Sequence, residues 1–475
     1  MANTDKKSQS NFNTALFGVS LDRGAAQPLH VQLTDTLRRL VLAHPHACGA
    51  RLPASRTLAA ELSVSRMTIT TAYDQLLGEG YLSARAGGGT FVADHLPHLS
   101  PPAPPASALP APPQRPRPFQ TGLPDPALFP HRIWARHLER AWRAPEADLL
   151  ATPDPFGWYP LRQAISAHLA AWRGLDCDPA QIIVTAGASD AFDLLFRTTL
   201  PTGSPVIMED PGWSPLRVAL KRAALKTQAL RIDADGLDPA RLPRARAAIV
   251  TPSRHFPTGR AMPLARRLAL LDWARTGDAL LIEDDYDSEF RYEGQPLPSL
   301  SGLDRLQRTV YLGSFSKLFS AALRLGYVVI PTALIDVARK RLQQAGTHAS
   351  LVPQPALANF MDSGEFATHL RRCRRTYAKR QAHLLAELAP LRTHLDLRPD
   401  RSGMHLCVAL KPALASHKTD RDIAAACATA GLTVRALSAH SVLPDPPQGL
   451  LLGYAGFDDA ALSAAVKTLT DVICR

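Results

Sequence analysis

Apolar residues recur at helical spacing near the start of the chain. One face of a helix predicted over residues 27–43 carries Leu29, Leu33, Leu37, Leu40 and Val41. A short helix, SRTLAAEL, is expected next with Ser55 as its N-cap, and a second helix begins after Ser65 and ends at Gly80. Two strand patterns, YLSA and TFVA, then surround the glycine-rich turn RAGGG. This order of elements predicts a winged helix-turn-helix over residues 25–94.

From residue 120 onward, short apolar runs alternate with amphipathic helical patterns. The strand-like runs are IIVTAG, PVIME, AAIVTPS, ALLIEDDYD, TVYLGSFS and LGYVVIP. Alternation of this kind predicts a mostly parallel sheet with helices on both faces. The later runs HLCVAL, TVRAL and GLLLGYA predict a smaller C-terminal α+β subdomain from about residue 350.

A proline-rich segment separates these two regions. Residues 95–119 contain ten of the 41 prolines and no glycine or acidic residue. Such a composition cannot build a core and favours extended polyproline II, so the segment is expected to be an interdomain linker, either a disordered spacer or a semi-rigid strut. The polar residues 1–24 are expected to form a flexible N-terminal tail. The whole therefore predicts a multidomain protein, with the second domain over residues 120–475.

Composition narrows the class of protein. The N-terminus has no apolar block typical of a secretory signal, and charges interrupt every candidate membrane span. The six cysteines have no paired spacing, which favours reduced thiols in a cytoplasmic protein and no metal or disulfide framework. The net charge of +12 suggests a polyanionic partner. Only +2 of it lies within residues 1–100, which hold nine basic and seven acidic residues, so charge alone does not locate a nucleic-acid site.

The second helix of the helix-turn-helix is where base contacts are expected, because its N-terminal side chains reach the major groove. Arg66 suits guanine, whose O6 and N7 match a guanidinium fork. Other candidate contacts with bases, phosphates or a groove are Ser65, Thr68, Thr70, Arg51, Arg56 and the wing-tip residues Gly87, Gly88 and Gly89. The alternative is a small helical domain with solvated arginines.

The whole region resembles the GntR-type winged helix-turn-helix. The stretches RLPASRTLA and GGGTFVA are the most specific parts of the resemblance. It implies binding to double-stranded DNA through Arg56, Ser65, Arg66, Thr68, Thr70 and the wing at Ala86–Gly87. Some relatives have arginine at the position of Thr70.

The second domain contains a lysine that follows an apolar strand. Lys317, in GSFSK after the strand TVYL, is placed to lose water, fall in pKa and form a Schiff base. Ser314, Ser316 and Arg324 lie close enough in the sequence to hold an anion beside it. A surface lysine in a polar loop is the alternative.

Three further motifs accompany the lysine. The acidic run EDDYD supplies a carboxylate for a pyridinium nitrogen and a tyrosine two residues on, although alone it is equally a metal-binding cluster or a solvated strand end. TAGAS forms a strand–turn–helix whose N–H groups suit a phosphate. The tryptophan of PGW offers a ring to stack on, or simply packs in the core.

Together these motifs resemble fold-type I pyridoxal phosphate enzymes, the aspartate aminotransferase-like group. GLPDPALFPHRIWARHL, TPSRHFPTG, EDDYDSEFRYEG and YLGSFSK further resemble the MocR subfamily of GntR regulators. The resemblance implies an internal aldimine at Lys317, a pyridine nitrogen partner in Asp284, a phenolic oxygen partner in Tyr286 and ring stacking by Trp213. It also implies phosphate contacts from Gly187, Ala188, Ser189, Ser314 and Arg324.

Two departures affect the effector rather than the cofactor. Arg435 is the candidate for an effector carboxylate, but relatives often have arginine where this chain has Ala439. SRHFPTG replaces the family's SHQ before the aromatic residue, so Arg254 and His255 either alter the wall near the phenolic oxygen or supply an anion contact.

The resulting hypothesis is a transcriptional regulator that binds DNA and pyridoxal 5′-phosphate. It senses the cofactor or an amino compound through an aldimine at Lys317, as a homodimer. The alternative is an active aminotransferase with an appended DNA-binding domain, since the residues for turnover are present. A structural scaffold with a dead pocket would have lost the lysine, which this chain retains.

Overall fold

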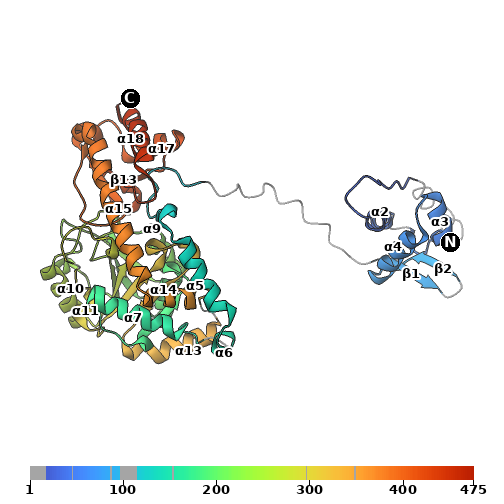
Figure 1. The fold of residues 1–475 in the computed structure, drawn as a ribbon, viewed down its shortest axis with the longest axis horizontal. Coiled ribbons are helices and arrows are strands. Elements are labelled where there is room, and N and C mark those ends of the chain that lie inside the picture. Colours follow the sequence, from blue (N-terminus) through green and yellow to red (C-terminus); the bar gives the residue numbers. More distant parts are fainter. Residues whose placement is uncertain are drawn as a thin grey trace. The chain divides into compact units, whose positions relative to one another are not determined.

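The computed structural model describes residues 18–44, 47–85, 88–96, 115–151, 154–295, 297–346 and 349–474. The chain divides into two compact units, Met1–Gln114 and Arg115–Arg475 (Figure 1). Ala86 and Gly87 of the predicted wing, residues 1–17 of the predicted tail and residues 97–114 of the predicted linker lie outside the described residues. Within the described ranges, no helix has the length and apolar character needed to cross a membrane.

The first unit has the predicted winged helix-turn-helix. Its elements are α2 (Leu29–Ala43), α3 (Ser55–Glu61), α4 (Arg66–Gly78) and an antiparallel hairpin of β1 (Leu82–Arg85) and β2 (Gly89–Val92). Ser65 caps α4, since its hydroxyl accepts a hydrogen bond from the Thr68 N–H at 3.1 Å. The predicted cap of α3 is wrong: Ser55 is the first helical residue, and Ala54 precedes it without a side-chain cap.

The core of the first unit extends beyond the predicted domain boundary. Leu33, Leu37 and Val41 of α2 are fully buried against Ile69 of α4. Val19, which the sequence assigns to a flexible tail, is buried in the same cluster. Arg23 donates a hydrogen bond to the carbonyl of Ser63. Residues 18–24 are therefore part of the folded unit, because an apolar side chain next to an open helical core is buried rather than left in water.

The second unit is built on the predicted α/β sheet. The strand order is β3-β9-β8-β7-β6-β4-β5, and every neighbouring pair is parallel except those that β9 makes. The strands are β3 (Ile182–Thr185), β4 (Pro205–Asp210), β5 (Lys226–Arg231), β6 (Ala247–Val250), β7 (Leu280–Asp285), β8 (Thr309–Ser314) and β9 (Gly326–Val329). Only β5 was not predicted among them; it is largely polar and lies at the sheet edge.

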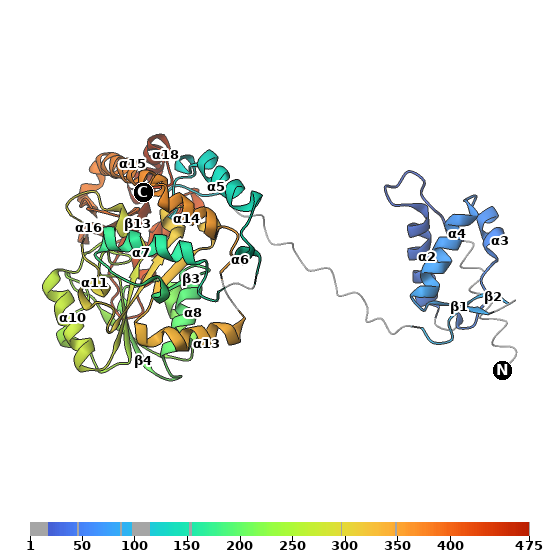
Figure 2. The same cartoon turned by 60° about the horizontal axis from the view of Figure 1, so that its bottom comes forward.

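Helices cover both faces of this sheet (Figure 2). Side chains alternate along each strand, so that Ile182 and Val184 face one core while Ile183 faces the other. One face is covered by α7 (Tyr159–Arg173), α10 (Leu264–Thr276), α11 (Leu300–Asp304) and α14 (Gln354–Asp362). The opposite face is covered by α8 (Ala188–Thr199), α9 (Ser214–Arg222) and α13 (Ile335–Ala345).

The C-terminal subdomain is the predicted smaller α+β part. Its antiparallel sheet has the order β10-β11-β13-β12, formed by Leu395–Asp396, His405–Leu410, Gly449–Gly453 and Arg435–Ala436 respectively. The long helix α15 (Glu365–Glu387) contacts α18 (Asp459–Cys474), as Figure 1 shows. The remaining α-helices of the second unit are α5 (His131–Arg143), α6 (Ala147–Leu150), α12 (Phe315–Leu318), α16 (Pro412–Ala415) and α17 (Asp420–Thr429).

The end of the predicted linker belongs to this second unit. Phe119 is fully buried and forms an antiparallel bridge with Gly453. The carbonyl of Pro118 accepts a hydrogen bond from the Thr433 N–H. The boundary predicted at residue 119 is thus too late, because a large aromatic residue at the end of the proline-rich run enters the core.

Candidate functional site

Two neighbouring parallel strands bring the predicted lysine and carboxylate to one edge of the sheet. Asp284 and Asp285 end β7 and are paired with Leu312 and Gly313 of β8. Lys317 lies just beyond β8, in the short helix α12. Ligands of open α/β sheets bind outside the carboxyl ends of the strands, so these residues lie where a ligand is expected.

The side chain of Lys317 is half-buried. Its Nζ donates a hydrogen bond to the carbonyl of Gly122 at 2.9 Å. Burial lowers the pKa of the lysine and the charge of Arg435 adds to this effect, while Asp287 and Asp284 oppose it. Gly122 has φ +70°, and a Cβ there would lie 2.7 Å from the Nζ atom. The positive φ at this position favours glycine. The lowered pKa favours the neutral, nucleophilic amine of Lys317.

Asp284 has an available carboxylate. Burial raises its pKa to about 7, the neighbouring Asp285 adds to the rise, and Lys317 opposes it. Within the described chain no hydrogen bond or ion pair to this carboxylate is formed, although Asp285 beside it accepts from Tyr311 at 2.6 Å and pairs with Arg173 at 2.8 Å. A half-buried carboxylate without a protein partner among the described residues suits a ligand with a protonated ring nitrogen.

Tyr286 is bound to one of the two residues that depart from the family pattern. Nη1 of Arg254 donates to the Tyr286 hydroxyl at 2.8 Å and lies 3.2 Å from Asp287. Both remaining guanidinium nitrogens reach Asp400, at 2.7 and 3.0 Å. Burial alone would lower the pKa of Arg254, but Asp400, Tyr286 and Asp287 raise it, so the buried cation is retained. Arg254 thus alters the wall at the predicted phenolic-oxygen position.

His255 is the second residue that departs from the family pattern, and its side chain contacts Thr258 rather than Tyr286. Its Nδ1 lies 2.8 Å from the hydroxyl of Thr258. Burial and the nearby arginines lower its pKa to about 3. The side chain is therefore neutral near pH 7 and does not add a charge to the site.

The predicted phosphate-binding residues lie around the start of α8. Gly187 is the N-cap with φ +105°, and a Cβ there would lie within 4 Å of the Arg324 guanidinium. Ala188 is half-buried and Ser189 is exposed in the first turn. Ser314 caps α12 by accepting from the Ser316 N–H at 3.2 Å, which leaves its O–H proton for donation. The free N–H groups of a helix start and an exposed arginine form a favourable place for an anion.

The last two predicted site residues, Trp213 and Arg435, form few specific contacts with the rest of the described site. The ring of Trp213, which precedes α9, is half-buried and lies 6.0 Å from the ring of Phe192. Arg435 on β12 is exposed, and its charge lowers the pKa of both Lys317 and His440. Arg435 is therefore near enough to influence the lysine, and within the described residues it forms no ion pair.

In the first unit, the start of α4 presents the predicted DNA-contact residues. Arg66 is exposed and its Nε donates to the Ser55 hydroxyl at 3.3 Å. The hydroxyls of Ser65 and Thr68 are 2.9 Å apart, and Thr70 donates to the Arg66 carbonyl. The hydroxyls of Ser65, Thr68 and Thr70 therefore form hydrogen bonds within the first turns of α4, and all three residues are at least partly exposed to solvent.

The other predicted DNA-contact residues lie on α3 and around the wing. Arg56 is exposed on α3. A Cβ on Gly89 would lie 3.3 Å from Nε of Arg51, which places Arg51 beside the wing. Gly88 is half-buried in the turn, whereas Gly87 is outside the described residues.

Sequence comparison assigns both units to known families. Residues 29–92 match the family "Bacterial regulatory proteins, gntR family", and residues 132–469 match "Aminotransferase class I and II". The chain is 37% identical over 471 residues to the probable rhizopine catabolism regulatory protein MocR of Rhizobium meliloti, covering 94% of each chain. It is 35% identical to the HTH-type pyridoxine biosynthesis transcriptional regulator PdxR of Corynebacterium glutamicum, covering 96% of this chain and 98% of PdxR.

This chain belongs to the MocR subfamily of GntR-type transcriptional regulators. The second unit of this MocR-type regulator has the fold of solved aminotransferases. An archaeal alanine:glyoxylate aminotransferase matches with a TM-score of 0.68 and 21% identity, over 75% of this chain and 90% of that chain. LysN, an α-aminoadipate aminotransferase from Thermus thermophilus complexed with N-(5′-phosphopyridoxyl)-L-leucine, matches with a TM-score of 0.66 and 26% identity, over 75% and 91%.

Two surface residues of the DNA-binding unit were not among the predicted contacts. Met67 follows Arg66 in α4 and is 71% exposed, although it is large and apolar. Its position off the buried face formed by Ile69 and Tyr73 was readable from helical periodicity. Arg85 at the wing lies over the ring of Phe91, 4.6 Å from its centroid, and 3.6 Å from Asp94. Arg85 could have been identified from the sequence, because it is a basic residue at the end of a predicted strand, next to the glycine-rich turn.

Proposed function

We propose that this MocR-type regulator binds pyridoxal 5′-phosphate covalently through Lys317 and that occupancy of the site changes its binding to DNA. The observation that carries the proposal is that the half-buried Lys317 donates to the Gly122 carbonyl, while the carboxylate of Asp284 on the neighbouring strand β7 has no hydrogen-bond partner among the described residues. When bound, this cofactor supplies an aldehyde that captures primary amines. A regulator with such a group can respond to the cofactor itself or to an amino compound.

The residues present fit the parts of this cofactor. Asp284 would pair with the ring nitrogen, because its raised pKa of about 7 lets carboxylate and ring share a proton near neutral pH. Tyr286 would bond the phenolic oxygen, with Arg254 holding the tyrosine hydroxyl in place. Trp213 would stack on the ring. The phosphate would be bound by Gly187, Ala188, Ser189, Ser314 and Arg324.

The relatives support this proposal through what their names record. PdxR is named for regulating pyridoxine biosynthesis, and LysN was solved with a phosphopyridoxyl compound. LysN shares the fold of the second unit, and PdxR resembles nearly the whole chain in sequence. The relatives that resemble the full chain are named as transcriptional regulators, which favours sensing over turnover.

Arg435 is the proposed contact for an effector carboxylate. Its exposed guanidinium lies near enough to Lys317 to lower the pKa of the amine, so an acid bound there would reach the same region with its amino group. An effector carboxylate would also neutralise Arg435 and thereby weaken that effect on Lys317.

On the DNA side, the proposed base contact is Arg66, with Arg51 and Arg56 on phosphates. Ser65, Thr68, Thr70 and the wing at Gly87–Gly88 are proposed to position the helix against the groove. A homodimer would present two such readers to two half-sites. A ligand then changes DNA affinity only if the two states of the dimer bind it with different affinity.

The test uses the purified full-length chain, its Lys317→Ala variant and Lys467→Ala as a matched control. Lys467 is an exposed lysine on α18, so its loss leaves the site intact. Each protein is mixed with pyridoxal 5′-phosphate, followed by absorbance, reduced with borohydride and weighed by mass spectrometry. We expect the parent and Lys467→Ala to retain one cofactor mass and Lys317→Ala to retain none. An unchanged covalent adduct in Lys317→Ala would refute the assignment.

A second measurement separates sensing from catalysis. The loaded parent is titrated with a panel of amino compounds while absorbance, keto-acid release and binding to operator DNA are followed. A spectral change with altered DNA affinity and no keto acid is the result expected for a sensor. When a second keto acid is added as amino acceptor, continuous release of the keto acid derived from the amino compound would establish an active aminotransferase instead.

A further inference from the structure

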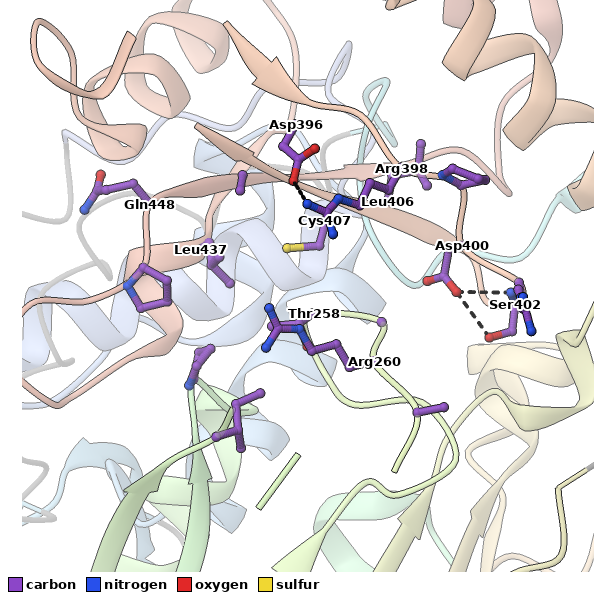
Figure 3. Close-up of a pocket in the computed structure, with 18 of the residues that line it drawn as sticks. Thr258, Arg260, Asp396, Arg398, Asp400, Ser402, Leu406, Cys407, Leu437 and Gln448 are labelled. Carbon is purple, nitrogen blue, oxygen red and sulfur yellow. Dashed lines mark hydrogen bonds and ion pairs between the residues drawn. The ribbon is translucent and has the colours of Figure 1, made fainter. Parts of the chain in front are cut away.

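A second cleft of about 670 Å³ lies between the large part of the second unit and its C-terminal subdomain. One side is formed by the loop that follows β6, including Thr258 and Arg260, and the other by the segment 396–402 and β11. In Figure 3, Arg260 extends from the loop, whereas Asp396 and Cys407 lie on β10 and β11 opposite and Arg398 lies in the segment between these strands. This volume is typical of pockets for small organic ligands.

Positive charge dominates the lining of this cleft. It contains five arginines and two aspartates. Both aspartates are already paired, Asp396 with Arg398 at 2.9 Å and Asp400 with Arg254 at 2.7 Å. The five arginines come from four separate segments and are Arg231, Arg260, Arg291, Arg398 and Arg401.

Three of these guanidinium groups have no ion pair within the described residues. Arg231 and Arg260 donate to backbone carbonyls, at 2.7 Å to Asp445 and 2.6 Å to Asp233. Nε of Arg291 is buried and has no hydrogen-bond partner in the described chain. Carbonyl contacts position a guanidinium without cancelling its charge, so the cleft retains an excess of positive charge.

The cleft also has an apolar wall. Ile232, Leu406 and Leu437 line it beside the arginines. A bare inorganic ion would leave this surface in contact with water, whereas an organic body would cover it. The mixture of guanidinium groups and apolar side chains favours an anionic group attached to a carbon skeleton.

A buried wall separates this cleft from the candidate cofactor site. Arg254 and His405 are each 2% exposed, and His405 lies against the Pro257 carbonyl at 3.0 Å. None of the described residues assigned to the cofactor lines the cleft. An anion bound by Arg260 or Arg398 is therefore distinct from one bound at the start of α8.

We propose that this cleft is a second ligand site, which takes a small organic phosphate. Several guanidinium groups that line one cleft from different segments suit a dianion with three acceptor oxygens better than a single carboxylate. The apolar wall receives the organic part. This proposal does not depend on the covalent chemistry proposed for Lys317.

The test is a calorimetric titration of the full-length chain with phenyl phosphate, compared with inorganic phosphate. Because the start of α8 is also suited to a phosphate, the titration is made in the Arg324→Ala variant as well as in the parent. We expect Arg324→Ala to keep one binding site for phenyl phosphate. We expect this variant to bind inorganic phosphate more weakly than it binds phenyl phosphate. Loss of all binding in Arg324→Ala would overturn the proposal.

Cleft variants are then made in the Arg324→Ala background. Arg398 and Arg401 have side chains 82% and 75% exposed, so replacing both with alanine leaves the core unchanged. We expect this double variant, and separately Arg260→Gln, to weaken phenyl phosphate binding by about tenfold or more. Arg275→Ala, at an exposed arginine of α10 away from the cleft, is the matched control. Equal affinity in the cleft variants and the control would also overturn the proposal.

Discussion

Replacing Arg254 with methionine tests whether the buried cation holds the two parts of the second unit together. The guanidinium contacts Asp287 and Tyr286 on the large part and Asp400 and the His405 carbonyl on the C-terminal subdomain. Methionine fills much of the space but removes the charge and every donor. Asp287 would then be a buried carboxylate without its cation, since its side chain is only 2% exposed.

The expected size of the effect follows from this burial. Removing one partner of a buried ion pair costs about 3–5 kcal/mol, because the remaining charge must stay desolvated or take up a proton. A unit of about 360 residues unfolds with an entropy near 0.75 kcal/mol per kelvin at about 2.1 cal/mol/K per residue. Arg254→Met is thus expected to lower the midpoint of thermal unfolding by about 4–7 °C.

Protonation gives the prediction a sign with pH. Burial already raises the pKa of Asp287 to about 7 while Arg254 opposes the rise. Without the cation this pKa increases further, so the variant takes up the proton readily below pH 6 and must keep or neutralise a charge above pH 8. The loss of stability is therefore expected to be larger at pH 8 than at pH 6.

Tryptophan fluorescence reports this transition selectively, because all six tryptophans fall after residue 114. Arg275→Ala is the control, since it breaks an exposed pair with Asp272 and should shift the midpoint by little, at about 0–1 kcal/mol. Adding Asp400→Asn to Arg254→Met should cost less than the two single changes together. A midpoint for Arg254→Met within error of that for Arg275→Ala would refute the reasoning.

Three further outcomes are expected. Asp284→Asn should stabilise the ligand-free protein by about 1–3 kcal/mol more at pH 8 than at pH 5. The reason is that the pKa of Asp284 is about 7 in the folded protein and 3.8 ordinarily, so ionisation of this carboxyl destabilises the folded state increasingly as the pH rises between these values. Equal shifts of the thermal midpoint at both pH values would contradict this. Arg66→Ala should weaken operator binding by about 1–3 kcal/mol in a fluorescence anisotropy titration, and an equal loss on random DNA would show a phosphate contact only. Met67→Ala should reduce discrimination for thymine at one operator position while leaving the salt dependence of binding unchanged, and a changed salt slope would argue against an apolar base contact.

Local sequence patterns predicted most elements of the fold and failed where tertiary packing decides. The fully apolar strands and the capped helix α4 follow from periodicity and from Ser65. The edge strand β5 was not predicted, because only one side of it pairs in the sheet and its side chains are largely polar. Val19 and Phe119 were assigned to a tail and a linker because their neighbours are polar or proline-rich, yet both are buried. Whether a single apolar residue is buried depends on contacts with residues far away in the sequence, and the residues next to it do not reveal those contacts.

The candidate site shows the same division. That Lys317 and Asp284 share one edge was predictable, because each follows a strand of a parallel sheet. The partner of Arg254 was not, since Asp400 is 146 positions away and belongs to another subdomain. The arginine-lined cleft was equally hidden, because its charges come from four segments that no local pattern connects.

The hydrogen bond between Lys317 and Gly122 joins the ligand site to the route by which the chain enters the second unit. Gly122 lies three residues after the buried anchor Phe119, and the chain upstream of that anchor leads to the DNA-binding unit. An amine that forms a covalent bond to a ligand loses N–H donors, so reaction at Lys317 competes directly with this hydrogen bond. Under the function proposed above, covalent reaction at Lys317 would therefore also change how firmly the segment that enters the second unit is attached.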